Sequence, residues 1–216
     1  IESGVAKKTI TDWEAYRDEL RARLGSDNKI VRLMHSRAKL DPKRVVFAEA
    51  DELAVLKAAQ IVYEEGIAEP ILLGRKKVIE ALMKEIEFDA DVTIIDPKSD
   101  EEESRKDKYA EVYWKQRKRR GITLLSAKKL LRERNYFAAM MVNVGDADAL
   151  ISGYSRSYPT VVKPILELIG LDKGVTRIAT TNLLMTQRGP LFLSDTSINI
   201  NPDSKDLATI ANMTAT

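Results

Sequence analysis

A short loop between an apolar stretch and a predicted helix collects the side chains best suited to hold an anion. The segment "SGYSRSYPT", residues 152–160, combines hydroxyl groups, the guanidinium of Arg156 and the N-terminus of a predicted helix. Backbone N–H groups at such a terminus, with hydroxyl and guanidinium donors, suit a phosphate or a carboxylate. Ordinary capping explains the same residues without a ligand, with Ser157 or Thr160 as the N-cap residue and Pro159 in the first turn. The residues alone leave both interpretations open.

Two further polar segments also have a functional and a structural explanation. The basic run "KQRKRRG", residues 115–121, follows the acidic "SDEEES", which favours a solvated helix end over a nucleic-acid site. One or two of its arginines could still point inward and grip a phosphate or carboxylate with the fork geometry of a guanidinium. In "FLSDTSININ", residues 192–201, Asp195 and Asn199 follow a predicted strand. Both residue types form turns through their own side chains, so a functional role requires a ligand in the same cleft.

Composition excludes several classes of function. The 216 residues include 35 basic and 33 acidic side chains, for a net charge of +2, so neither nucleic acid nor a membrane is the expected partner. Cysteine is absent, which excludes disulfides and thiolate metal sites and favours a reducing cytoplasm. The glycine-rich loops that bind dinucleotides or nucleoside triphosphates do not occur, and His35, the lone histidine, fits a surface or packing role on a charged helix rather than a catalytic one.

Short apolar runs alternate with segments of helical periodicity. Such alternation, with helices of about ten to fifteen residues, predicts right-handed crossovers and a parallel sheet, hence an α/β fold. The predicted strands are 44–48, 70–74, 91–96, 149–152, 175–181 and 190–194. The predicted helices are 12–24, 29–38, 53–65, 75–87, the latter part of 98–120, 126–144, 159–169 and the chain from 204 onward.

The order of these segments resembles the phosphate acetyltransferase family. The motifs that carry the resemblance are "KRVVFAEADE", "PILLG", "RKRRGIT", "MMVNVGDADALISG" and "LFLSDTSIN", within about residues 42–212. The N-terminal "SGVAKKTITDWEAYRDEL" is similar to the segment that joins the catalytic part of large bacterial malic enzymes to their phosphate acetyltransferase-like C-terminal region. The resemblance implies a linker and helical connection over residues 1–40, a first lobe over 41–172, and the start of an incomplete second lobe over 173–216.

The resemblance also implies a fold and a ligand. The expected fold is a three-layer α/β/α sandwich of the phosphate acetyltransferase type, related to isocitrate and isopropylmalate dehydrogenases, with a cleft for acetyl-CoA or acetyl phosphate. This chain is expected to hold no cofactor or metal of its own. NAD(P) and a divalent metal, Mg²⁺ or Mn²⁺, would belong to an upstream malic enzyme domain, and the assembly is expected to be a homo-oligomer.

Departures from the family pattern bear on catalysis. Arg117 matches one of the arginines that the family places around the phosphate, whereas Lys163 replaces the arginine of its "LRPA" motif and Ala54 replaces another. Lysine keeps the charge but loses the bidentate fork, and removing one preorganised donor typically costs about a hundredfold in rate. Binding of a ground-state ligand survives such losses more easily. The predicted ligand-binding residues, none of them catalytic, are Arg117, Ser152, Arg156, Lys163, Asp195 and Asn199.

Three functions follow, in order of preference. The first is a regulatory and assembly module of a malic enzyme, which binds acetyl-CoA while the parent chain oxidatively decarboxylates malate to pyruvate. The second is an active phosphate acetyltransferase. The third is an oligomerisation domain whose cleft binds nothing.

Overall fold

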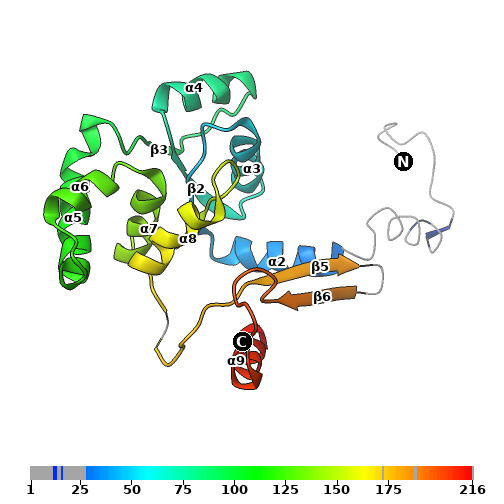
Figure 1. Ribbon diagram of the computed structural model, residues 1–216. Helices are drawn as coiled ribbons and strands as arrows, with labels where there is room; N and C mark the ends of the chain where they lie inside the picture. Colours follow the sequence, from blue (N-terminus) through cyan, green and yellow to red (C-terminus); the bar gives the residue numbers. More distant parts are fainter. Residues whose placement is uncertain (1–11, 14–15, 17–27, 172, 187–188, 216) are drawn as a thin grey trace. The chain divides into compact units, whose positions relative to one another are not determined.

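The computed structural model describes residues 12–13, 16, 28–171, 173–186 and 189–215 (Figure 1). The chain divides into two compact units, one of residues 37–173 and one that groups 174–216 with the chain before residue 37. Helix α2 (Asn28–Leu40) covers the predicted helix 29–38, whereas nearly all of the predicted helix 12–24 lies outside the described residues. The domain limits expected from the sequence stay predictions.

The larger unit is built on a four-stranded parallel sheet. Strands β1 (Lys43–Phe47), β2 (Ala68–Leu73), β3 (Thr93–Ile95) and β4 (Ala149–Ile151) lie in the order β3-β2-β1-β4. In the central strand, Val46 is paired with Ile71 on one side and Leu150 on the other. The parallel sheet predicted from the alternation of strands and helices is confirmed.

Helices cover both faces of this sheet and complete the predicted three layers (Figure 1). Successive strand residues point to opposite faces, so Val46 packs in one core and Phe47 in the other. The Phe47 core contains α3 (Leu53–Glu64) and α4 (Lys76–Glu85). The Val46 core contains α5 (Glu103–Arg117), α6 (Leu124–Leu130), α7 (Arg134–Val144) and α8 (Tyr158–Leu168). The charged stretch before α6 is helical from Asp100 to Arg120, because 3₁₀ turns flank α5 at both ends.

The single long helix predicted over 126–144 is wrong. The chain forms α6 and α7 with a tight turn between them. Thr123 and Ser126 form a reciprocal capping box that starts α6. The carboxylate of Glu133 then accepts the backbone N–H groups of Asn135 and Tyr136, so a new helix begins there.

The second unit contains a β-hairpin and a helix. Strands β5 (Thr181–Thr186) and β6 (Gly189–Ser194) pair antiparallel, and α9 (Ser204–Ala215) follows. The strand predicted over 175–181 is wrong, because residues 175–180 are irregular and pairing starts at Thr181. Within this irregular segment, the carbonyl of Ile178 accepts a hydrogen bond from the Asn199 amide instead of from a neighbouring strand.

Among the helices that the structure describes, none is long and apolar enough to span a bilayer.

Leucines on and next to α6 provide a matched test of the core. Leu131 is fully buried in the Val46 core, whereas Leu125 is 65% exposed. We expect Leu131→Ala to lower the free energy of unfolding by about 2–5 kcal/mol, because it leaves a cavity. Leu125→Ala should change it by less than about 0.5 kcal/mol. Urea unfolding followed by circular dichroism measures both, and equal effects would contradict the assignment of Leu131 to the core.

Candidate functional site

The loop that was predicted to hold an anion binds one supplied by the chain itself. The carboxylate of Glu49, just after β1, accepts the backbone N–H groups of Gly153 (2.9 Å), Tyr154 (2.7 Å) and Ser155 (3.1 Å). The Ser155 hydroxyl adds a fourth donor at 2.7 Å. Glu49 is 1% exposed, so these donors offset the cost of burying its charge. Three backbone N–H groups and one hydroxyl of the loop therefore bind Glu49 instead of an external ligand.

The pKa of Glu49 follows from this environment. Burial raises the pKa, but the Ser155 hydroxyl and the three backbone N–H groups stabilise the carboxylate and hold the pKa below its ordinary 4.5. The predicted side-chain capping of α8 is not seen. Ser157 occupies the N-cap position of α8, but its hydroxyl contacts the Thr160 hydroxyl at 2.8 Å and makes no cap bond to the helix backbone.

A second carboxylate next to Glu49 organises an arginine. Asp51 accepts two hydrogen bonds from Arg134 at the start of α7, at 2.6 and 3.1 Å, and a longer one from Arg75 at 3.4 Å. Burial raises the pKa of Asp51, but the two guanidinium groups outweigh it and the pKa lies below its ordinary value. These contacts join the ends of β1 and β2 to the beginning of α7.

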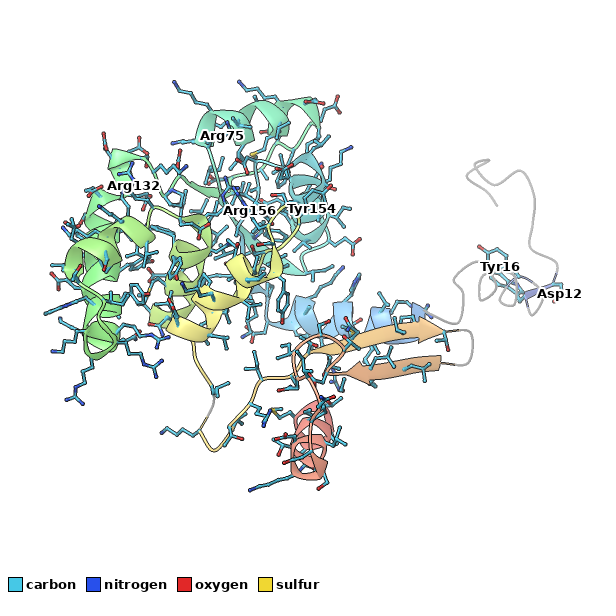
Figure 2. All side chains as sticks on the ribbon, in the orientation of Figure 1. Asp12, Tyr16, Arg75, Arg132, Tyr154 and Arg156 are labelled. Atoms are coloured by element: carbon cyan, nitrogen blue, oxygen red, sulfur yellow. The ribbon has the colours of Figure 1, made fainter. Side chains whose placement is uncertain are left out.

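Around these groups lies a hollow of about 500 Å³, the carboxyl-edge hollow, beyond the C-terminal ends of the strands. Open α/β sheets bind ligands at this edge. Figure 2 labels three of its arginines, Arg75, Arg132 and Arg156, which come from separate stretches of the chain. Its lining residues are Asp51, Glu52, Gly74, Arg75, Asp96, Pro97, Lys98, Arg132, Glu133, Arg134, Ser155, Arg156 and Thr160.

A different hollow, of about 520 Å³, contains Arg117 and Lys163 and is called the Lys163 hollow below. It lies between the end of α5 and α8, and its lining is Tyr113, Arg117, Arg120, Ile122, Tyr158, Pro159, Val162, Lys163, Leu166 and Glu167. Arg117 Nε donates to the Glu167 carbonyl at 2.9 Å, and within the described part of the chain its outer guanidinium nitrogens make no hydrogen bond to protein groups. Lys163 is exposed on α8.

Two tyrosines brace the wall of the Lys163 hollow. The hydroxyl groups of Tyr113 and Tyr136 each donate to the Glu167 carboxylate at 2.9 Å. Burial, with the hydrogen bond to Glu167, raises the pKa of Tyr113 to about 12. The tyrosines therefore stay protonated and serve as donors that fix α8, which carries Lys163.

The six predicted ligand residues thus lie in different places. Arg117 and Lys163 meet at one hollow and Arg156 lines the other. The Ser152 hydroxyl donates to the buried Asn135 amide at 2.7 Å. Asp195 and Asn199 belong to the second unit, where Asp195 accepts the amide and the backbone N–H of Asn199 within one turn. Their parts in ligand binding stay predictions.

Several residues that form or line the carboxyl-edge hollow were not identified from the sequence. Glu49 acts through an interaction that joins distant parts of the chain, and Arg132 sits where a continuous helix was predicted. Arg75 carries a usable signal, because it directly follows the "PILLG" strand at the edge where α/β sheets bind ligands. The aspartates of the "GDADAL" motif serve the fold. Asp148 accepts a paired hydrogen bond from Arg44, and Asp146 accepts the Tyr109 hydroxyl.

Among the described residues, no group of three or more histidine, aspartate or glutamate side chains is placed to hold a metal ion.

Comparison with known proteins identifies the family. Residues 29–216 match the family described as phosphate acetyl/butaryl transferase. The chain belongs to this family. A solved structure, the EutD phosphotransacetylase from Staphylococcus aureus, superposes with a TM-score of 0.76 and 27% identity, over 86% of this chain and 55% of that one. The predicted family and fold are confirmed.

Relatives in sequence fall into two groups. The chain is 36% identical over its whole length to the NADP-dependent malic enzyme of Haemophilus influenzae, of which it spans 29%. It is 32% identical, over 84% of its length, to the phosphate acetyltransferase of Thermoanaerobacterium thermosaccharolyticum, of which it spans 56%. The chain thus corresponds to part of each of these relatives.

The Glu49 interaction makes a prediction for stability. In Glu49→Gln the side-chain amide faces backbone donors with an N–H₂ group, so the free energy of unfolding at pH 7 should fall by about 2–3 kcal/mol. Because the pKa of Glu49 is lower in the folded state, its contribution is complete above pH 4.5 and is lost as the pH falls through the folded pKa. The difference between the two proteins should therefore shrink below pH 4.5 in urea unfolding.

The exposed Glu80 on α4 provides the control, because Glu80→Gln should change stability by less than about 0.5 kcal/mol. A Glu49→Gln protein as stable as the wild type at pH 7 would contradict the structural role of this carboxylate.

Proposed function

We propose that this chain is a regulatory and assembly module of a malic enzyme and that it binds acetyl-CoA. The observation that carries the proposal is the alignment with a malic enzyme along the whole chain, whereas the alignment with a phosphate acetyltransferase covers 84% of it. The parent reaction would be the oxidative decarboxylation of malate to pyruvate. Its NAD(P) and divalent metal would be held by residues outside this chain.

The Lys163 hollow supports the binding part of the proposal. Its basic groups, Arg117, Arg120 and Lys163, suit the phosphates of a coenzyme A ester. Ile122 and Val162 offer an apolar surface to the pantetheine arm and the acyl group. A site that combines apolar walls with a few convergent polar groups is the usual design for such ligands. Of the six predicted ligand residues, Arg117 and Lys163 line this hollow; the parts of Ser152, Arg156, Asp195 and Asn199 in ligand binding stay predictions.

Loss of catalysis with retention of binding fits the residues of this hollow. Lys163 offers a point charge where the family motif has the fork of an arginine, which weakens stabilisation of a transition state more than binding of a ground state. A bound acetyl-CoA would then act as an effector, and only to the extent that its affinity differs between two conformations of the parent enzyme. Assembly into a homo-oligomer would give such conformations a shared interface.

A titration of acetyl-CoA into the full-length protein tests the proposal. We expect Lys163→Ala to weaken binding about tenfold, since one charge-assisted contact to a phosphate is lost. Lys129, an exposed lysine on α6, is the matched control, and Lys129→Ala should leave the affinity unchanged. Isothermal titration calorimetry measures both. The proposal fails if wild-type protein does not bind acetyl-CoA, or if both variants weaken binding equally.

Membership of the transferase family supports a second candidate, an active phosphate acetyltransferase. An assay with acetyl phosphate and CoA separates the two. Under the first proposal, acetyl-CoA forms no faster with the protein than without it. The Lys163→Arg substitution alone should not give the protein full acetyltransferase activity. Rapid turnover that Arg117→Ala abolishes would favour the transferase. Normal assembly without acetyl-CoA binding would leave only a structural role.

A further inference from the structure

An apolar groove lies between α4 and the edge strand β3. This hollow, called the α4–β3 groove below, has a volume of about 650 Å³. Met83, Phe88, Ala90 and Ile94 give it an apolar lining, and all four side chains pack in the Phe47 core. None of its lining residues belongs to the carboxyl-edge hollow or to the Lys163 hollow. The groove is therefore a preformed surface that is separate from both.

The outer edge of β3 offers peptide groups to a further strand. Among the strands that the structure describes, β3 has β2 as its only neighbour. The Ile95 carbonyl accepts the backbone N–H of Gly74, so it points toward the end of β2. Peptide groups of successive strand residues point to opposite edges of the strand, so the N–H and C=O groups of Ile94 point away from β2. An unpaired strand edge of this kind is a template for pairing with another chain.

The rim of the α4–β3 groove is negatively charged. Its lining has three acidic side chains, Glu80, Glu87 and Asp89, and one basic side chain, Lys84, and all four are exposed. Within the described part of the chain, none of these three carboxylates makes a hydrogen bond or an ion pair. Helix α4 ends at Glu85, and the partial negative charge of a helix C-terminus adds to that of the carboxylates. A partner with basic side chains would relieve this repulsion.

We propose that the α4–β3 groove docks an extended segment of a partner protein, in which an apolar residue is flanked on the same face by lysine or arginine. Such a segment would add a strand to β3, with its peptide groups bonded to Ile94. Alternate side chains of a strand share a face, so the apolar residue would enter the groove and the basic ones would reach Glu87 and Asp89. A second copy of the chain fits poorly, because pairing β3 with β3 would bring like-charged rims together. The proposal does not depend on the proposed acetyl-CoA function.

Fluorescence anisotropy with the full-length protein tests the proposal. The probe is a fluorescein-labelled, C-terminally amidated peptide of sequence Lys-Thr-Val-Thr-Lys. Its controls are the same peptide with glutamate in place of lysine and a version that is N-methylated at its central residues. We expect both controls to bind at least about tenfold more weakly than the probe, because one loses the charge attraction and the other loses backbone hydrogen bonds. Bound probe should also slow amide hydrogen exchange in residues 90–95, measured by mass spectrometry.

Variants of the rim separate docking in the groove from general attraction to the protein. The double variant Glu87→Gln/Asp89→Asn should weaken binding of the probe about three- to tenfold, because each exposed ion pair contributes modestly. It should melt at the wild-type temperature, since both side chains are exposed. Asp100→Asn/Glu101→Gln is the matched control, because it also removes two exposed carboxylates and neither lines the groove.

Several results would overturn the proposal. It fails if wild-type protein does not bind the probe at millimolar concentration, if the N-methylated peptide binds as well as the probe, or if the two double variants weaken binding equally. It also fails if the probe slows exchange only outside residues 90–95. Strong protection of these residues in the protein alone, lost on dilution, would show instead that a second copy occupies the groove.

Discussion

The arrangement of the larger unit depends on one buried charge, the carboxylate of Glu49. It ties the end of β1 to the loop after β4 through four donors, and a buried carboxylate needs such donors because desolvation is costly. Once Ser155 is fixed on Glu49, the next residue, Arg156, stands at the rim of the carboxyl-edge hollow. The same interaction both closes the fold at this edge and determines which side chains remain for a ligand.

Acidic and basic side chains have different roles in this unit. Acidic side chains are used for structure: Glu49 in the loop, Asp51 with Arg134, and Asp148 with Arg44 at the opposite edge of the sheet. The lining of the Lys163 hollow has three basic side chains, Arg117, Arg120 and Lys163, and one acidic side chain, Glu167. A net charge of +2 therefore does not exclude a local excess of positive charge, because the average over the chain says nothing about where the charged side chains lie.

Sequence reasoning succeeded where local patterns determine the structure. Alternating strands and helices predicted the parallel sheet, since burial on both faces requires apolar strands and crossover helices. It failed where the local structure depends on residues that are far apart in the sequence. The loop at 152–160 had two explanations, ligand or capping, and neither included Glu49. The helix break needed recognition of Glu133 as a cap in a run rich in arginine and lysine. Arg117 and Lys163 came from the family resemblance, while Arg132 was hidden by that missed break.

Helix α8 contributes lining residues to both hollows. Thr160 lines the carboxyl-edge hollow, whereas Tyr158 and Lys163 line the other. The N-terminal end of α8 follows the loop held by Glu49, and its C-terminal end is held where Arg117 and Asn143 donate to carbonyls of the last turn. Since both ends are anchored, a ligand in one hollow need not move the helix. Any coupling between the hollows would then act through electrostatics or a change of the whole unit.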